Sequence, residues 1–328
     1  MLNSIIIIST FILFSIIIPK SRNDNENDKY LSLDTSTILR GIAILLVIFQ
    51  HFGGSFGTNL LTPLGGTGVA IFLVLSGFGL NESFKKKGLD YYWRNRIIRV
   101  FIPYFIFISL ISCCSKNFDI RIYLLDILGI KTSYWYIGFL LKQYIVYYIA
   151  TRFFYKFRLQ IIFVTSIIFI FILPNIEAEQ GLSFLLGVLI SENYNKVCSS
   201  KLFTKNILIF SFFCIGTIFL AIKQLAIIRE YEDHYIWHWI QLFIKLPYAI
   251  FFILIIHKLP IFKSRFLIFT GMISYELYLV HMIFLKYIDM KLMNAFIVLI
   301  VSFALSYLFY LLNQHINTFL RQRIKVNF

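Results

Sequence analysis

Two ionisable residues lie within one apolar stretch of the sequence, and their types suit acid–base chemistry. Arg40 and His51 are eleven residues apart in the segment RGIAILLVIFQHFGG. On a helix, eleven residues advance about 16 Å and return to within about 20° of the starting direction, so both side chains would share one face. Histidine is the usual general base near neutral pH. The pair indicates a catalytic face, with a packing histidine and an arginine that reaches the membrane surface as the open alternative.

The next apolar segment, PLGGTGVAIFLVLSGFGLNES, is rich in glycine. Small residues allow membrane helices to approach one another closely, and glycine also lets the backbone approach a bound ligand. Gly66 and Gly68 suit either purpose, and Ser76 adds a hydroxyl to the same segment. These three residues are therefore candidates for ligand binding, with helix packing as the alternative.

An arginine-rich stretch follows in the segment FKKKGLDYYWRNRIIRVFIPYF. Arg94, Arg96 and Arg99 stand just ahead of an apolar helix that contains Pro103. The planar guanidinium group offers donors that match phosphate oxygens. The cluster could hold a phosphorylated cofactor or attract anionic lipid, although some positive charge is expected at any cytoplasmic membrane boundary.

The composition indicates that the elements that position these residues are membrane helices. Of 328 residues, 59% are apolar and 14% charged, whereas soluble domains carry about 45–50% apolar and about 25% charged residues. In lipid each backbone polar group must be satisfied within its own segment, which favours an all-α fold. The net charge of +15 is then read as topology information rather than as a nucleic-acid surface. The four cysteines show no metal-ligand or disulfide pattern, so no metal is expected.

Eleven apolar segments can be counted along the chain. Residues 1–19 lack the basic start and small-residue cleavage site of a signal peptide, so we expect an extra N-terminal transmembrane helix that is retained. Residues 20–34 form a polar linker, and the division falls between residues 1–30 and a main domain over residues 31–328. The main domain is expected to be a polytopic bundle of about ten helices, near 37–53, 66–82, 100–115, 134–150, 158–174, 180–191, 206–222, 237–256, 266–285 and 293–312.

The basic residues predict the orientation of these helices. Lysine and arginine concentrate in cytoplasmic loops, and 22 of the 31 fall in one set of alternating connections, against seven in the other. This alternation predicts an outside N-terminus and a cytoplasmic C-terminus in the plasma (inner) membrane. The arginine-rich stretch then lies on the cytoplasmic side.

In this order the motifs resemble the membrane-bound acyltransferase-3 family. That family's pattern has an arginine and a histidine about eleven apart, then a glycine-rich helix ending in Ser-Gly-Phe, then an arginine-rich segment leading to a proline. Two later segments are also similar to the family, WYIGFL over residues 135–140 and SYELYLVH over residues 274–281. The resemblance runs from about Ser32 to about residue 315.

The resemblance implies an O-acyltransferase, usually an O-acetyltransferase. Such an enzyme moves an acyl group from cytoplasmic acyl-CoA, acetyl-CoA above all, to a hydroxyl of an extracytoplasmic or lipid-linked surface glycan. It implies that His51 is the general base and that Arg40 orients the donor or anchors its pantetheine-phosphate end. His281 matches the later segment and is a second candidate, for which a structural hydrogen bond is the favoured role. The implied donor-binding residues are Arg94, Arg96, Arg99, Gly66, Gly68 and Ser76.

Some members of the family carry an extracytoplasmic hydrolase-like domain, which is not expected after residue 328. The chain would then complete the transfer itself or work with a partner protein. A transporter or flippase of a lipid-linked sugar remains the alternative function, although the related halves typical of transporters are not visible. A polysaccharide polymerase would need a larger outside loop. His234 and His238 lie four apart near carboxylates, but aromatic residues at a membrane boundary explain that segment better than a metal site does.

Overall fold

The computed structural model describes residues 2–17, 31–115, 118–130, 132–199, 206–232, 234–256, 258, 264–288 and 291–326. Within these ranges every regular element is helical and no β-strand occurs, which confirms the predicted all-α membrane class. Most of the predicted polar linker, residues 20–30, lies outside the described residues.

Seven of the described helices are long and apolar enough to cross a membrane. An eighth span is formed if α15 (Arg265–Met272) and α16 (Ser274–Phe284), which meet at a bend of 77°, are taken together. The seven are α2 (Leu33–Ser55), α3 (Thr62–Lys87), the run of α4 (Tyr92–Arg96) into α5 (Ile102–Cys113), α8 (Arg158–Ile172) with the short turn before it, α12 (Asn206–Lys223), α14 (Tyr235–Ile255) and most of α17 (Leu292–Val326).

Three further helices coincide with the remaining apolar segments. They are α1 (Leu2–Ile17), α7 (Trp135–Phe153) and α10 (Ser183–Glu192). Two of them are short, and α7 carries Lys142 and Gln143 near its middle. Each expected segment therefore corresponds to a helix or a bent pair, while the count of eleven spans and their orientation stay predictions.

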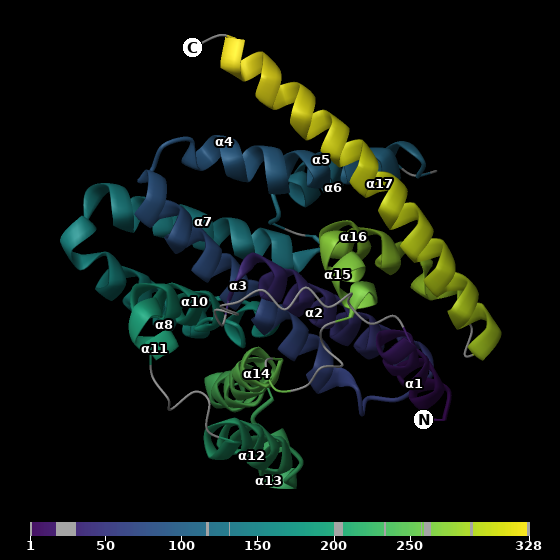
Figure 1. The fold of residues 1–328 in the computed structure, drawn as a ribbon. Helices are drawn as coiled ribbons and strands as arrows, with labels where there is room; N and C mark the ends of the chain where they lie inside the picture. The colour runs from purple at the N-terminus through teal and green to yellow at the C-terminus, as the bar shows by residue number, and fades with distance from the viewer. Residues whose placement is uncertain are drawn as a thin grey trace.

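The centre of the bundle is formed by α2, which packs on α3, α15, α16 and α1 (Figure 1). It begins after Ser32, whose side chain accepts a hydrogen bond from the backbone N–H of Thr35 at 3.2 Å. Most of its side chains are buried. The extra helix α1 docks on this core through Phe11, whose ring lies 5.4 Å from that of Phe49. The long α17 crosses one side of the bundle, past α16 and α5 (Figure 1).

The path from α3 to α5 contains two backbone irregularities. Gly88 and Tyr91 both have positive φ, 60° and 54°, in the turn that ends α3 and starts α4. Between α4 and α5, residues Ile97–Phe101 form a π-helical turn that includes Arg99. Pro103 explains this widening, because it has no N–H to bond the carbonyl of Arg99 as an α-helix would require.

Candidate active site

A cavity of about 890 Å³ opens between the end of α3, α4, the π-helical turn, α7 and the last turns of α17. Its inner wall is buried and includes Leu75, Leu80 and Tyr144. Among its lining residues, Asp90 is the single carboxylate. The cationic ones are Arg40, Lys86, Lys87, Arg94, Arg96, Arg99 and Arg321.

None of these seven cations forms an ion pair with a carboxylate in the part of the chain that the structure describes. The Nε atoms of Arg94 and Arg96 are covered and have no hydrogen-bond partner among the same residues. Aromatic rings support both guanidinium groups: Arg94 lies 3.7 Å from the ring centroid of Tyr91, and Arg96 lies 5.2 Å from that of Tyr92. Such a cluster of like charges suits an anion that carries several negative groups.

At its inner end, the cavity reaches a set of hydroxyl groups. Ser76 lines the cavity, and its hydroxyl is beside those of Tyr136 and Tyr144 on α7. The charge of Arg40 acts on the same two tyrosines. This end of the cavity therefore offers one cation and the hydroxyls of Ser76 and Tyr144, with the hydroxyl of Tyr136 beside that of Ser76.

Aromatic rings connect this inner end to two histidines. The ring of Tyr136 lies 5.4 Å from that of Tyr278 on α16, and Tyr278 lies 6.2 Å from His281. His281 in turn lies 5.4 Å from His51 on α2. The residues that sequence analysis assigned to donor binding and to base catalysis are thus joined by a continuous series of side chains.

The hydrogen bond of His281 defines the state of its ring. Its Nδ1 is 2.7 Å from the carbonyl oxygen of Leu277, and because a carbonyl only accepts, Nδ1 must donate. In a neutral ring Nε2 then carries the lone pair. That atom is buried and has no hydrogen-bond partner among the described residues. His281 therefore presents an unused acceptor next to His51.

Five of the predicted site residues come together in the cavity, namely Arg40, Ser76, Arg94, Arg96 and Arg99. His51 and His281 form a pair that does not line the cavity.

The two predicted glycines do not line the cavity either. A Cβ on Gly68 would collide with the backbone oxygen of Ala43 in α2, and one on Gly66 would collide with the side chain of Lys245. Their observed contacts are those of close helix packing.

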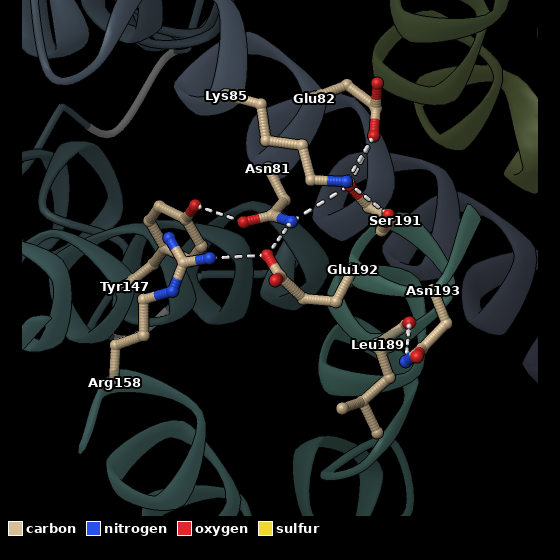
Figure 2. A network of polar contacts seen from close by, with 9 residues as sticks. All are labelled: Asn81, Glu82, Lys85, Tyr147, Arg158, Leu189, Ser191, Glu192 and Asn193. Atoms are coloured by element: carbon tan, nitrogen blue, oxygen red, sulfur yellow. Dashed lines mark hydrogen bonds and ion pairs between the residues drawn. The ribbon is translucent and has the colours of Figure 1, made fainter. Parts of the chain in front are cut away.

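A buried polar network fastens the helices beside the cavity (Figure 2). Tyr147 donates to Asn81 Oδ1 at 2.6 Å, and the Asn81 amide donates to Ser191 Oγ at 2.9 Å and to Glu192 Oε1 at 2.6 Å. Glu192 is also paired with Arg158. These contacts tie α3, α7, α8 and α10 together.

The same network holds α4 in place. The ring of Tyr92 stacks on that of Tyr147 at 6.3 Å, and its hydroxyl donates to the carbonyl oxygen of Tyr144 at 2.7 Å. Arg96, which lies over the Tyr92 ring, is thereby positioned from α7.

Sequence reasoning missed several residues of this site. Arg321 was counted only as loop charge, and Tyr91 was not singled out. Tyr136 belongs to the family-like segment WYIGFL, and Tyr144 follows it two helical turns later, which was the available signal.

A second polar region surrounds the short helix α9 (Asn175–Ala178). Lys142 is paired with Glu177 at 2.6 Å, and Lys245 is paired with Glu179. His238 contacts the carbonyl oxygen of Ile170 at 2.9 Å, and its Nε2 is 3.0 Å from Asn175 Oδ1. This buried histidine is thus engaged in helix contacts.

Comparison with known proteins identifies the family. Neither the curated proteins nor the solved structures contain a match to the chain. A family model described as an acyltransferase domain, that of the acyltransferase-3 family, matches residues 32–311. This range includes α2, α3, α7 and α16, which carry both histidines and the inner end of the cavity. The chain therefore belongs to the acyltransferase-3 family and is a membrane acyltransferase.

Proposed function

We propose that this protein is an O-acyltransferase, with acetyl as the transferred group, that uses cytoplasmic acyl-CoA as donor and a hydroxyl of an extracytoplasmic or lipid-linked glycan as acceptor. In the orientation that the basic loops predict, the cavity would lie on the cytoplasmic side of the plasma membrane. The acceptor, such as a growing capsule, exopolysaccharide or O-antigen, would then approach from the other side of the membrane.

The basic cavity is the observation that carries the proposal. Coenzyme A bears several phosphate groups, and the cavity lining has seven cations and one carboxylate. Arg94 and Arg96 line the cavity, and their guanidinium groups carry donors of the kind that phosphate oxygens accept from. The cavity volume of about 890 Å³ also falls within the roughly 300–1,000 Å³ typical of ligand pockets.

In the proposed reaction His51 is the general base. It takes the proton of the acceptor hydroxyl while the hydroxyl oxygen attacks the thioester carbonyl carbon. The C–S bond then breaks, and the coenzyme A thiolate leaves with the proton that His51 returns. Arg40 and Ser76, at the inner end of the cavity, would orient the pantetheine arm and its acyl group toward His51.

His281 is proposed to assist His51. A general base is commonly oriented by a third group. The free Nε2 of His281 can accept a hydrogen bond from a ring N–H of His51, which would leave the other His51 nitrogen unprotonated for the acceptor.

The first experiment compares donor binding with turnover in lipid nanodiscs. Acetyl-CoA affinity and release of free coenzyme A thiol, with water as the acceptor, would be measured for the wild type, His51→Ala and Arg96→Ala. Arg152→Ala, an exposed arginine outside the cavity, is the matched control. We expect His51→Ala to bind acetyl-CoA but lose turnover by a factor of about 10²–10⁴, and Arg96→Ala to bind it more weakly.

Two results would contradict the proposal. Turnover that persists in His51→Ala would remove the base assignment. A wild-type protein without affinity for acetyl-CoA would remove the acyl-CoA donor and favour handling of a lipid-linked sugar instead.

A further inference from the structure

The rim of the basic cavity differs in chemistry from its inner end. The inner wall is formed by buried or half-buried residues such as Arg40, Ser76 and Tyr144, whereas Tyr91 and Arg321 at the rim are exposed. The rim thus adds an aromatic ring and further cations to a site whose inner end already holds hydroxyls and an arginine. A ligand that fits both parts must carry a planar or apolar group together with additional negative charge at its outer end.

Tyr91 is held in an unusual position. Among the described residues it is the one non-glycine with positive φ, at 54°, and its side chain is 58% exposed. Left-handed backbone is unfavourable for a residue with a Cβ, and an exposed ring gains little from burial in return. Strain of this kind concentrates at ligand-binding positions. The guanidinium of Arg94, 3.7 Å from the ring centroid, fixes the orientation of the ring.

Arg321 reaches the rim from the far end of the chain. The 35 residues of α17 span about 52 Å at 1.5 Å per residue, which exceeds the roughly 30 Å of bilayer hydrocarbon. The last turns of this long helix bring Thr318, Arg321 and Gln322 to the cavity. Arg321 lies close enough to Arg99 for their like charges to interact, and it has no carboxylate partner among the described residues.

We propose that Tyr91 and Arg321 recognise the nucleotide end of the acyl donor, with the adenine base on the Tyr91 ring and its neighbouring phosphate on Arg321. Aromatic and guanidinium faces are the groups on which bases stack, and arginine binds phosphate through two parallel hydrogen bonds. The pantetheine arm carries no nucleobase, so it offers the Tyr91 ring no stacking partner. This inference rests on the proposed function and makes it more specific, because it selects free coenzyme A thioesters over acyl groups carried on a protein-bound phosphopantetheine.

The test compares two donors that differ only in the nucleotide. KM would be measured in nanodiscs of neutral lipid for acetyl-CoA and for S-acetyl-4′-phosphopantetheine, which lacks the adenosine 3′,5′-bisphosphate part. We expect Tyr91→Ala and Arg321→Ala each to raise the KM for acetyl-CoA about tenfold. The same substitutions should alter the KM for the truncated donor by less than about twofold, because the truncated donor makes no rim contact.

Two further variants of Tyr91 separate an effect on donor recognition from an effect on folding. Tyr91→Phe keeps the ring and should retain the wild-type KM for acetyl-CoA. Tyr91→Gly relieves the backbone strain but removes the ring. Its unfolding temperature should therefore be no lower than that of the wild type, while its KM should still be raised. Arg152→Ala again serves as the control for loss of a surface cation.

The outcomes distinguish this inference from the proposed function. If the wild type uses both donors with equal KM, or if the substitutions weaken both donors equally, the nucleotide assignment is wrong while acyl-CoA transfer stands. If neither donor is bound, the proposed function itself fails. If addition of anionic lipid to the discs abolishes the effect of Arg321→Ala on acetyl-CoA, the rim binds lipid headgroups and the inference is overturned.

Discussion

Two groups of charged side chains in this bundle illustrate opposite uses of charge. Around α9, each lysine has its own carboxylate: the buried Lys245 is paired with Glu179, and Lys142, whose side chain is 35% exposed, is paired with Glu177. In the basic cavity, seven cations share the space with Asp90, and none forms an ion pair with a carboxylate within the described ranges. Paired charges can hold helices together without a ligand, whereas a set of unpaired cations is neutralised only when an anion binds.

The largest expected effect comes from breaking a pair around α9. Lys245→Met would leave the carboxylate of Glu179, whose side chain is 9% exposed, without its partner. Removal of one member of a buried pair costs about 3–5 kcal/mol, so thermal unfolding of the purified protein should occur at a clearly lower temperature. Adding Glu179→Gln should recover most of the loss.

An exposed pair provides the matched control for that experiment. Lys85 and Glu82 are 3.0 Å apart, with side chains 35% and 27% exposed. Lys85→Met should cost less than about 1 kcal/mol, because exposed ion pairs contribute little. Equal unfolding temperatures for Lys245→Met and the wild type would show that pairing around α9 is not what stabilises that region.

A cavity arginine should behave in the opposite way. Arg99 is surrounded by the like charges of Arg321, Arg96 and Arg40, so Arg99→Gln should leave the unfolding temperature of the donor-free protein unchanged or raise it. Acetyl-CoA affinity should fall about tenfold. This corresponds to the lower part of the free-energy range for hydrogen bonds to charged groups, which applies because the site is open to solvent. A destabilised variant with unchanged affinity would remove the contrast between the two regions.

A higher salt concentration should give the smallest of the three effects, and it should again distinguish the cavity from the ion pairs around α9. Near 1 M salt the screening length falls to about 3 Å, so the dissociation constant for acetyl-CoA should rise severalfold. The Lys245–Glu179 pair near α9 is buried and is screened less, so the unfolding temperature should change little. Titration of binding and thermal unfolding over one salt series measures both; affinity that is independent of salt would contradict electrostatic capture of the donor.

The sequence predicted the helices well because their signal is local. The lengths of their apolar segments mark α2 and α3. The motifs on and after them bring Arg40, Ser76 and the three arginines near α4 into one cavity. The blocks similar to the acyltransferase-3 family also predicted the family, which the match over residues 32–311 confirms.

What could not be predicted depends on contacts between distant segments. Lys142 and Lys245 fall inside apolar segments, and nothing in their neighbourhood indicates that both partners come from the short PNIEAEQ stretch. Arg321 follows the final apolar run, and its place on the cavity depends on how α17 crosses the bundle. The backbone of Tyr91 is set by the turn between two helices rather than by its own preference.

The continuity of α17 has a mechanical consequence. Arg321 lies near one end of this helix, and earlier along it Asn313 donates a buried hydrogen bond of 2.9 Å to Glu276 on α16, the helix that carries His281. This one helix, α17, therefore links the rim of the cavity to the helix that carries His281. A displacement of α17 when the rim is filled would be transmitted through this contact to α16, so that binding of the proposed donor would change the position of His281.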